Sequence, residues 1–140
     1  MILRITELTA IKDRLANTTA LEKERRILDE QLGIDAKAVT DLIARNARVA
    51  QNQKEYNERY DALVSQYEDT KRKRDAVVKQ IDQVMIRRRK IERFIETVKP
   101  LPKLITEFDE SLWAALVDSM TVYSKDRIVF RLTCGIEIEA

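Results

Sequence analysis

One apolar repeat constrains this 140-residue chain more than any other feature. From Val39, steps of alternately three and four residues reach mostly apolar or aromatic side chains without a slip as far as Val98. A 3.5-residue period held over about eight heptads is typical of a left-handed coiled coil, so 39–98 predicts one helix of about 90 Å with at least one partner helix. The predicted seam is Val39, Leu42, Asn46, Val49, Gln53, Tyr56, Tyr60, Leu63, Tyr67, Val77, Ile81, Val84, Ile91 and Ile95.

The composition agrees with a helical chain. Only two residues are Gly and two are Pro, and 36% are charged. Such a scarcity of helix breakers argues against an all-β fold. No apolar run approaches the roughly 18 residues that span a bilayer, so we expect no membrane partner. The first residues lack the pattern of a signal peptide, which predicts a cytoplasmic protein.

A partner helix for the seam is available in the first 32 residues. Apolar side chains recur there at helical spacing at Ile5, Leu8, Ile11 and Leu15, and the stripe resumes at Leu21, Leu28 and Leu32 after a six-residue step that breaks its phase. Residues 1–98 are therefore predicted to form an antiparallel coiled-coil hairpin. The remaining question is where the chain turns back.

Two positions for the turn are consistent with the sequence. In the preferred one, at 33–35, Gly33 ends a helix in the left-handed conformation and Asp35 caps the next helix. The stripe from Val77 to Val98 would then need a partner from another chain or from sequence upstream of Met1. The alternative is the polar stretch 45–52, which has no Gly or Pro but uses both arms fully and brings Glu22 near Arg74.

The C-terminal part has a different pattern. Pro100 and Pro102 end the long helix and predict a linker at 99–104. In 105–140, Asp109 is placed to cap a short helix over about 110–119. Short β-type segments follow at 121–123, 128–132 and 136–138, separated by polar turns. The predicted fold is therefore mainly α, a long coiled-coil hairpin followed by a short helix and a small β-meander.

Several catalytic chemistries are excluded by composition. The chain has no His and a single Cys, Cys134, so it cannot assemble a Ser-His-Asp triad, a Cys-His pair or a Cys-rich zinc site. No Gly-rich phosphate loop is present either. We expect no enzymatic activity and no cofactor.

Positive charge gathers in 71–93, which holds ten basic and three acidic side chains. Two clusters about 24 Å apart along a helix could reach phosphates on a duplex. The favoured interpretation is that these residues are solvated flanks of the coiled coil; the alternative is an accessory DNA-binding arm. Its candidate DNA contacts are Lys71, Arg72, Lys73, Arg74, Arg87, Arg88, Arg89, Lys90 and Arg93.

Three segments resemble the C-terminal region of large serine recombinases, which integrate and excise bacterial mobile genetic elements. They are 46–64 (NARVAQNQKEYNERYDALV), 108–124 (FDESLWAALVDSMTVYS) and 135–139 (GIEIE). In that family a coiled coil projects from a DNA-binding zinc ribbon and the chain then returns to complete the ribbon. The resemblance implies that 1–98 is the projecting coiled coil and that 105–139 is the returning part.

The resemblance also implies a function. Projecting coiled coils of these site-specific recombinases contact one another between DNA-bound subunits and control synapsis and the direction of recombination. The expected partners are other recombinase subunits, DNA in the full-length protein and an accessory directionality factor, and a homo-oligomer is compatible with the seam. The competing class is a structural coiled-coil oligomerisation protein, for which the heptads alone would be sufficient.

Overall fold

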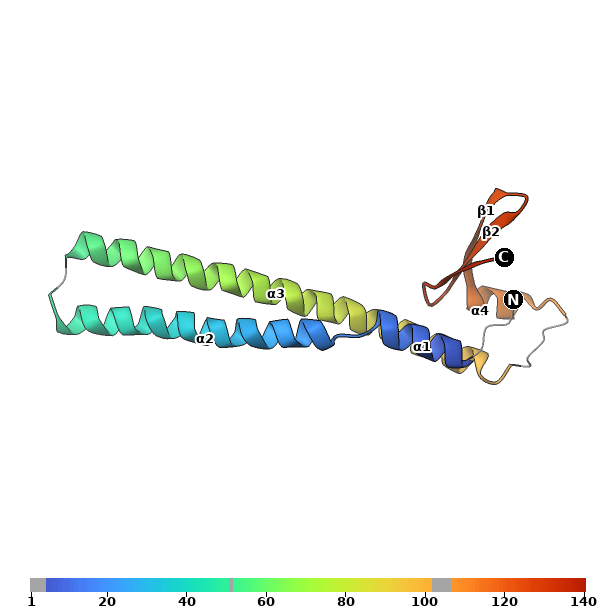
Figure 1. Cartoon of the computed structure of the whole chain (residues 1–140), viewed down its shortest axis with the longest axis horizontal. Helices are drawn as coiled ribbons and strands as arrows, with labels where there is room; N and C mark the ends of the chain where they lie inside the picture. The colour runs from blue at the N-terminus through green and yellow to red at the C-terminus, as the bar shows by residue number, and fades with distance from the viewer. Residues whose placement is uncertain (1–4, 51, 102–106) are drawn as a thin grey trace. The chain divides into compact units, whose positions relative to one another are not determined.

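The computed structural model describes residues 5–50, 52–101 and 107–140. It is mainly helical and ends in a three-stranded antiparallel sheet, which confirms the predicted fold class (Figure 1). Residues 102–106, with the second half of the predicted linker, lie outside the described residues. The elements are α1 (Ile5–Leu15), α2 (Thr19–Arg48), α3 (Gln53–Val98), α4 (Glu110–Leu116), β1 (Val117–Ser124), β2 (Arg127–Leu132) and β3 (Glu137–Glu139).

The chain consists of two compact units. The hairpin unit is Thr18–Asp82, and the sheet unit is Met1–Asn17 with Gln83–Ala140. The boundary between them falls inside α3, so one continuous helix contributes to both. In the hairpin unit α2 lies antiparallel to the first part of α3 (Figure 1).

The predicted turn at 33–35 is wrong, because α2 continues through Gly33 without interruption. Gly33 does not adopt a positive φ, and Asp35 lies inside the helix rather than at its start. A Gly inside a helix costs only about 1 kcal/mol, which is less than burying two or three more seam side chains of α2 contributes.

The chain turns at 49–52, inside the alternative stretch. The amide of Val49 closes the last turn of α2 on the carbonyl of Arg45, and the side chain of Asn52 accepts from the amides of Lys54 and Glu55 at the start of α3. An Asn followed three residues later by Glu is a helix-start signal that could have located this turn.

This turn also corrects the predicted single helix of about 90 Å. Val39 to Val49 belong to the first arm, and the second arm, α3, has 46 residues, or about 70 Å. The step from Val49 to Gln53 is four residues, so the heptad phase is the same on both sides of the loop. The repeat therefore gave no indication of the break.

The facing pairs of the arms differ by one heptad from the alternative prediction. Arg74 lies 3.8 Å from Asp29 (Nε to Oδ1), whereas Glu22 pairs with Arg25 on its own helix. Glu22 and Asp29 are seven residues apart and so occupy the same face of α2. Apolar spacing cannot distinguish these two registers, since both bury the same stripe.

The sheet unit has its own apolar core. Leu8 and Ile91 are fully buried and pack with Phe94, Ile95, Leu132 and Cys134. The C-terminal part of α3 thus finds its partner in α1 of the same chain, whereas a turn at Gly33 would have required a partner from another chain or from sequence upstream of Met1.

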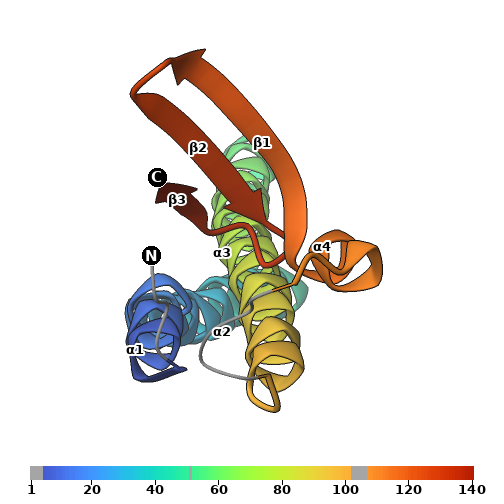
Figure 2. The same cartoon turned by 90° about the vertical axis from the view of Figure 1, so that its right-hand side faces the viewer.

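The three strands form a meander in the order β1-β2-β3 (Figure 2). The carboxylate of Asp109 accepts from the amide of Leu112 at 3.1 Å, which confirms the predicted cap of α4. The helix ends at Leu116 rather than near residue 119, because Val117 pairs with Leu132 and starts β1. The β2–β3 turn places Gly135 at a φ of 87°.

Candidate functional site

A buried polar layer crosses the hairpin unit at Asp35. Its side chain is 3% exposed, and the amides of Gln31 and Gln66 each donate to Oδ1 at 2.9 Å. The hydroxyl of Thr70, which is 8% exposed, lies 2.9 Å from Oδ2. One carboxylate therefore connects α2 to α3 through two side chains of the facing arm.

This layer replaces an apolar contact with a directional one. A buried carboxylate is tolerated only where donors compensate its lost hydration, and here the donors sit at fixed heights along both arms. The sequence interpretation placed Asp35 at a helix start and missed this role. Continuing the α2 heptad from Leu28 and Leu32 to residue 35 would have placed Asp35 on the seam.

The predicted seam follows the buried face of both arms except at the turn. From Tyr56 to Ile95 every predicted seam residue is buried or half-buried, as are Val39, Leu42 and Asn46. Gln53 is exposed and Val49 is 63% exposed. The carbonyl oxygen of the Asn46 side chain is buried and has no hydrogen-bond partner in the part of the chain that the structure describes.

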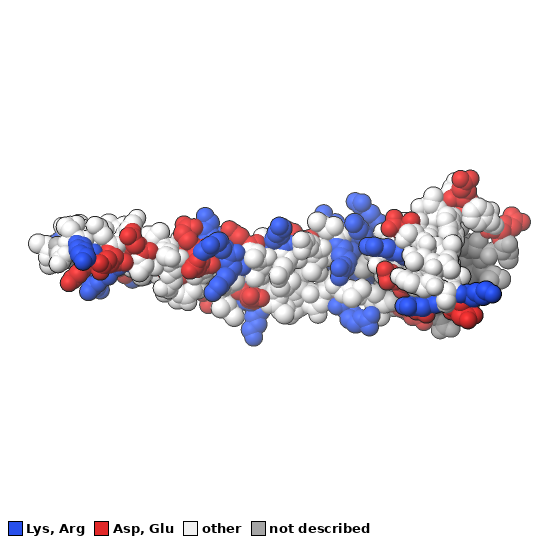
Figure 3. Space-filling model, turned by 90° about the horizontal axis from the view of Figure 1, so that it is seen from above, with Lys and Arg blue, Asp and Glu red and all other residues white. Residues whose placement is uncertain are grey.

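The end of the hairpin unit, which we call the tip, consists of residues 47–50, 52–53 and the first turns of α3. The rings of Tyr56 and Tyr60 stack there with centroids 6.1 Å apart. Val49, at the C-terminal end of α2, exposes most of its side chain. Figure 3 shows mainly uncharged atoms at this end, on the left. The tip combines apolar and aromatic surface of the kind that protein partners cover.

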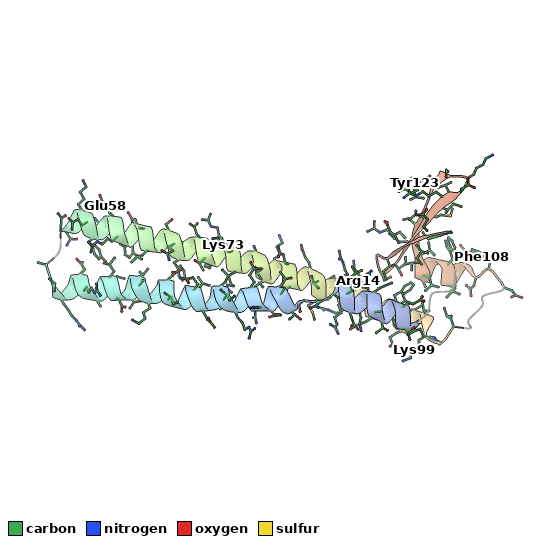
Figure 4. All side chains as sticks on the ribbon, in the orientation of Figure 1. Arg14, Glu58, Lys73, Lys99, Phe108 and Tyr123 are labelled. Atoms are coloured by element: carbon green, nitrogen blue, oxygen red, sulfur yellow. The ribbon has the colours of Figure 1, made fainter. Side chains whose placement is uncertain are left out.

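Ion pairs divide the nine candidate DNA contacts into two groups. Arg72 pairs with Asp69, Arg74 lies against Asp29 and Asp75, and Arg88 donates to Glu92 at 3.1 Å. Arg74 and Arg88 occupy seam positions, so they are half-buried. The other six are exposed and make no ion pair within the described residues, as at Lys73 (Figure 4): Lys71, Lys73, Arg87, Arg89, Lys90 and Arg93.

Cys134 is 3% exposed in the core of the sheet unit. Burial raises the pKa of its thiol, and hydrogen bonds with the backbone of Ile136 and of Cys134 itself offset this only partly. The thiol therefore stays protonated at neutral pH. Across the described ranges, no group of three or more Cys, Asp or Glu side chains is placed to hold a metal ion.

Comparisons with known proteins identify no relative of this chain. No protein-family model matches it, and no curated protein and no solved structure was found to match it. None of the described helices combines the length and apolar character that crossing a membrane requires.

Proposed function

We propose that this chain is a non-catalytic coiled-coil module of a site-specific DNA recombinase, and that it mediates the subunit contacts that control synapsis and direction. The fold supports this proposal. A long antiparallel hairpin is followed by a small α/β part, which is the arrangement that the resemblance to large serine recombinases implies. Such a module acts in the cytoplasm beside DNA held by the rest of the recombinase.

The proposal rests on a difference between the two surfaces of the hairpin unit: the seam is covered, whereas the tip is exposed. Along the hairpin unit the seam of α3 is already occupied by α2, so it has no free face for a second subunit. At the tip, by contrast, the side chain of Val49 is 63% exposed, and the half-buried rings of Tyr56 and Tyr60 stack on the first turns of α3. Subunit contacts therefore form at the tip, and an accessory directionality factor is a second partner for the same surface.

Sedimentation equilibrium of the whole chain tests the contact. We expect reversible self-association at high micromolar concentration, and we expect Val49→Asp to weaken it about tenfold or more, because a carboxylate would have to be desolvated against an apolar surface. Ile27→Asp is the matched control. Ile27 is 56% exposed on α2 but lies outside the tip, so its substitution should leave association unchanged.

Two results would contradict the proposal. A strictly monomeric species at high micromolar concentration removes the contact itself. Equal weakening by Val49→Asp and Ile27→Asp removes the assignment to the tip. The link to recombination is tested separately by the genomic sequence upstream of the codon for Met1, where a serine-recombinase reading frame is expected and an unrelated gene would contradict the family assignment.

A further inference from the structure

A cavity of about 520 Å³ opens between α3 and the β2–β3 turn, entirely within the sheet unit. One wall is a single face of α3, where Gln83, Ile86, Arg87 and Lys90 follow helical spacing. The opposite wall is formed by Arg131 and the turn that contains Gly135. The cavity therefore joins parts of the chain about 40 residues apart in sequence.

Three cationic side chains line this cavity. Arg87 and Lys90 lie one helical turn apart on α3, and Arg131 extends from β2. Asp118 is the one carboxylate among the lining residues, and it lies 4.0 Å from Arg131 with both side chains more than half exposed. Neither Arg87 nor Lys90 has an ion-pair partner within the described residues. The lining thus carries an excess of two positive charges.

The floor and the turn are fixed before any ligand arrives. Ile91, Leu132 and Cys134 form a floor that is at most 7% exposed. Thr133 ties the turn to α4, since its amide donates to Leu116 O at 3.0 Å and its hydroxyl to Ala115 O at 2.9 Å. A preformed wall lowers the entropic cost of binding. The protonated thiol of Cys134 adds no negative charge that would repel an anion.

We propose that this cavity binds a phosphate group through Arg87, Lys90 and Arg131. A carboxylate is satisfied by one guanidinium in a two-bond fork, whereas a phosphate presents three or four oxygens and can engage several cations together. Two guanidinium groups and an ammonium that line one cavity from two elements match the latter. The phosphate belongs either to a nucleic-acid backbone or to a small phosphate compound. The proposal is independent of the subunit contacts at the tip.

Two titrations of the whole chain distinguish these sources. Inorganic phosphate, followed by amide NMR, should shift the resonances of 83–91 and 131–136 in either case. A fluorescently labelled 20-base-pair duplex, followed by anisotropy over a range of salt concentrations, should bind only if the site accepts a backbone phosphate. Changing Arg87, Lys90 and Arg131 together to Gln should weaken phosphate binding about tenfold or more. The same change should reduce the salt slope of duplex binding by about 1.

The matched control changes Arg89, Arg93 and Lys99 together to Gln. These side chains carry the same total charge, are exposed in the same unit and do not line the cavity. The proposal is overturned if phosphate fails to shift the cavity resonances, or if both triple variants lose the same affinity, since the effect is then one of net charge. Circular dichroism of both triple variants verifies that they remain folded.

Discussion

At the scale of the residue, the most consequential side chain is Asp35. This buried carboxylate accepts hydrogen bonds from Gln66 and Thr70 of the facing arm. The stability of the hairpin unit therefore depends on the register in which the two arms pair. Apolar seam contacts tolerate sliding by a heptad, but a slipped register would leave this carboxylate against a side chain such as Leu63 or Val77, without the same donors. We infer that the layer selects the observed register from those that the apolar pattern permits.

Replacing Asp35 with Ala should lower the free energy of unfolding by about 1–3 kcal/mol, because the amide of Gln66 loses its buried acceptor. Urea unfolding followed by circular dichroism measures this. Asp41→Ala is the control: Asp41 is exposed and, among the described residues, pairs only with Lys37 on the same helix, so the change should stay within about 0.5 kcal/mol. Equal effects of the two substitutions would show that the layer contributes nothing particular.

Cys134 makes the sheet unit sensitive to alkaline pH. Its thiol pKa is raised by burial from the ordinary value of 9.0, so the folded state favours the protonated form. The unfolded chain loses this proton first as the pH rises, and the free energy of unfolding therefore falls from about pH 9 upward through the raised pKa. Urea midpoints between pH 7 and 10 should fall less steeply in Cys134→Ser. Parallel curves for both proteins would contradict this.

At the scale of the element, the two glycines have opposite roles. Neither has an atom within 4 Å of where a Cβ would stand, but only Gly135 has a positive φ. Gly33→Ala should therefore stabilise α2 by about 0.5–1 kcal/mol, while Gly135→Ala should destabilise the β2–β3 turn by about 1–2 kcal/mol. Thermal or urea unfolding of the two variants checks this. A destabilised Gly33→Ala protein would restore the case for a turn at 33–35.

Spacing predicted the buried faces of the helices better than it predicted where they end. The heptad from Tyr56 to Ile95 coincides with the buried side of α3, because burial and periodicity have the same geometric cause. The observed turn was only the less favoured of the two predicted positions, since the loop keeps the heptad phase and contains neither Gly nor Pro. Gly33, which has no neighbour where a Cβ would stand, was the preferred position for the turn.

The residues of the candidate sites were likewise predicted only in part. The basic side chains of α3 were predicted as one group, yet Arg74 and Arg88 face the seam and pair with carboxylates. Arg131 was not predicted, because only the folded chain brings β2 beside α3 in the sheet unit. A single sequence shows which charged residues share a helix face, but it does not show which strand packs next to that face in the folded chain.

At the scale of the whole molecule, the path of the chain is tested by one cross-link. In a Cys134→Ser background, cysteines at 35 and 70 should form an intramolecular disulfide under mild oxidation, because Asp35 and Thr70 are in side-chain contact. Cysteines at 28 and 70 represent the register displaced by one heptad and should cross-link far more slowly. Mass spectrometry of the oxidised monomers gives the yields. Faster reaction of 28 with 70 would show that the register is displaced.

Antiparallel pairing within the hairpin unit gives this part of the chain an adjustable length. Moving along α2 toward the tip corresponds to moving back along α3: Asp29 lies against Arg74, and Asp35 bonds with Thr70 and Gln66. Removing seven residues from each arm on the tip side of the Asp35 layer would keep every remaining facing pair and shorten the reach by about 10 Å. Removing seven residues from one arm alone would change the register between the arms, so that Asp35 would no longer face Gln66 and Thr70. Evolution can therefore change the reach of such a hairpin only by paired insertions or deletions.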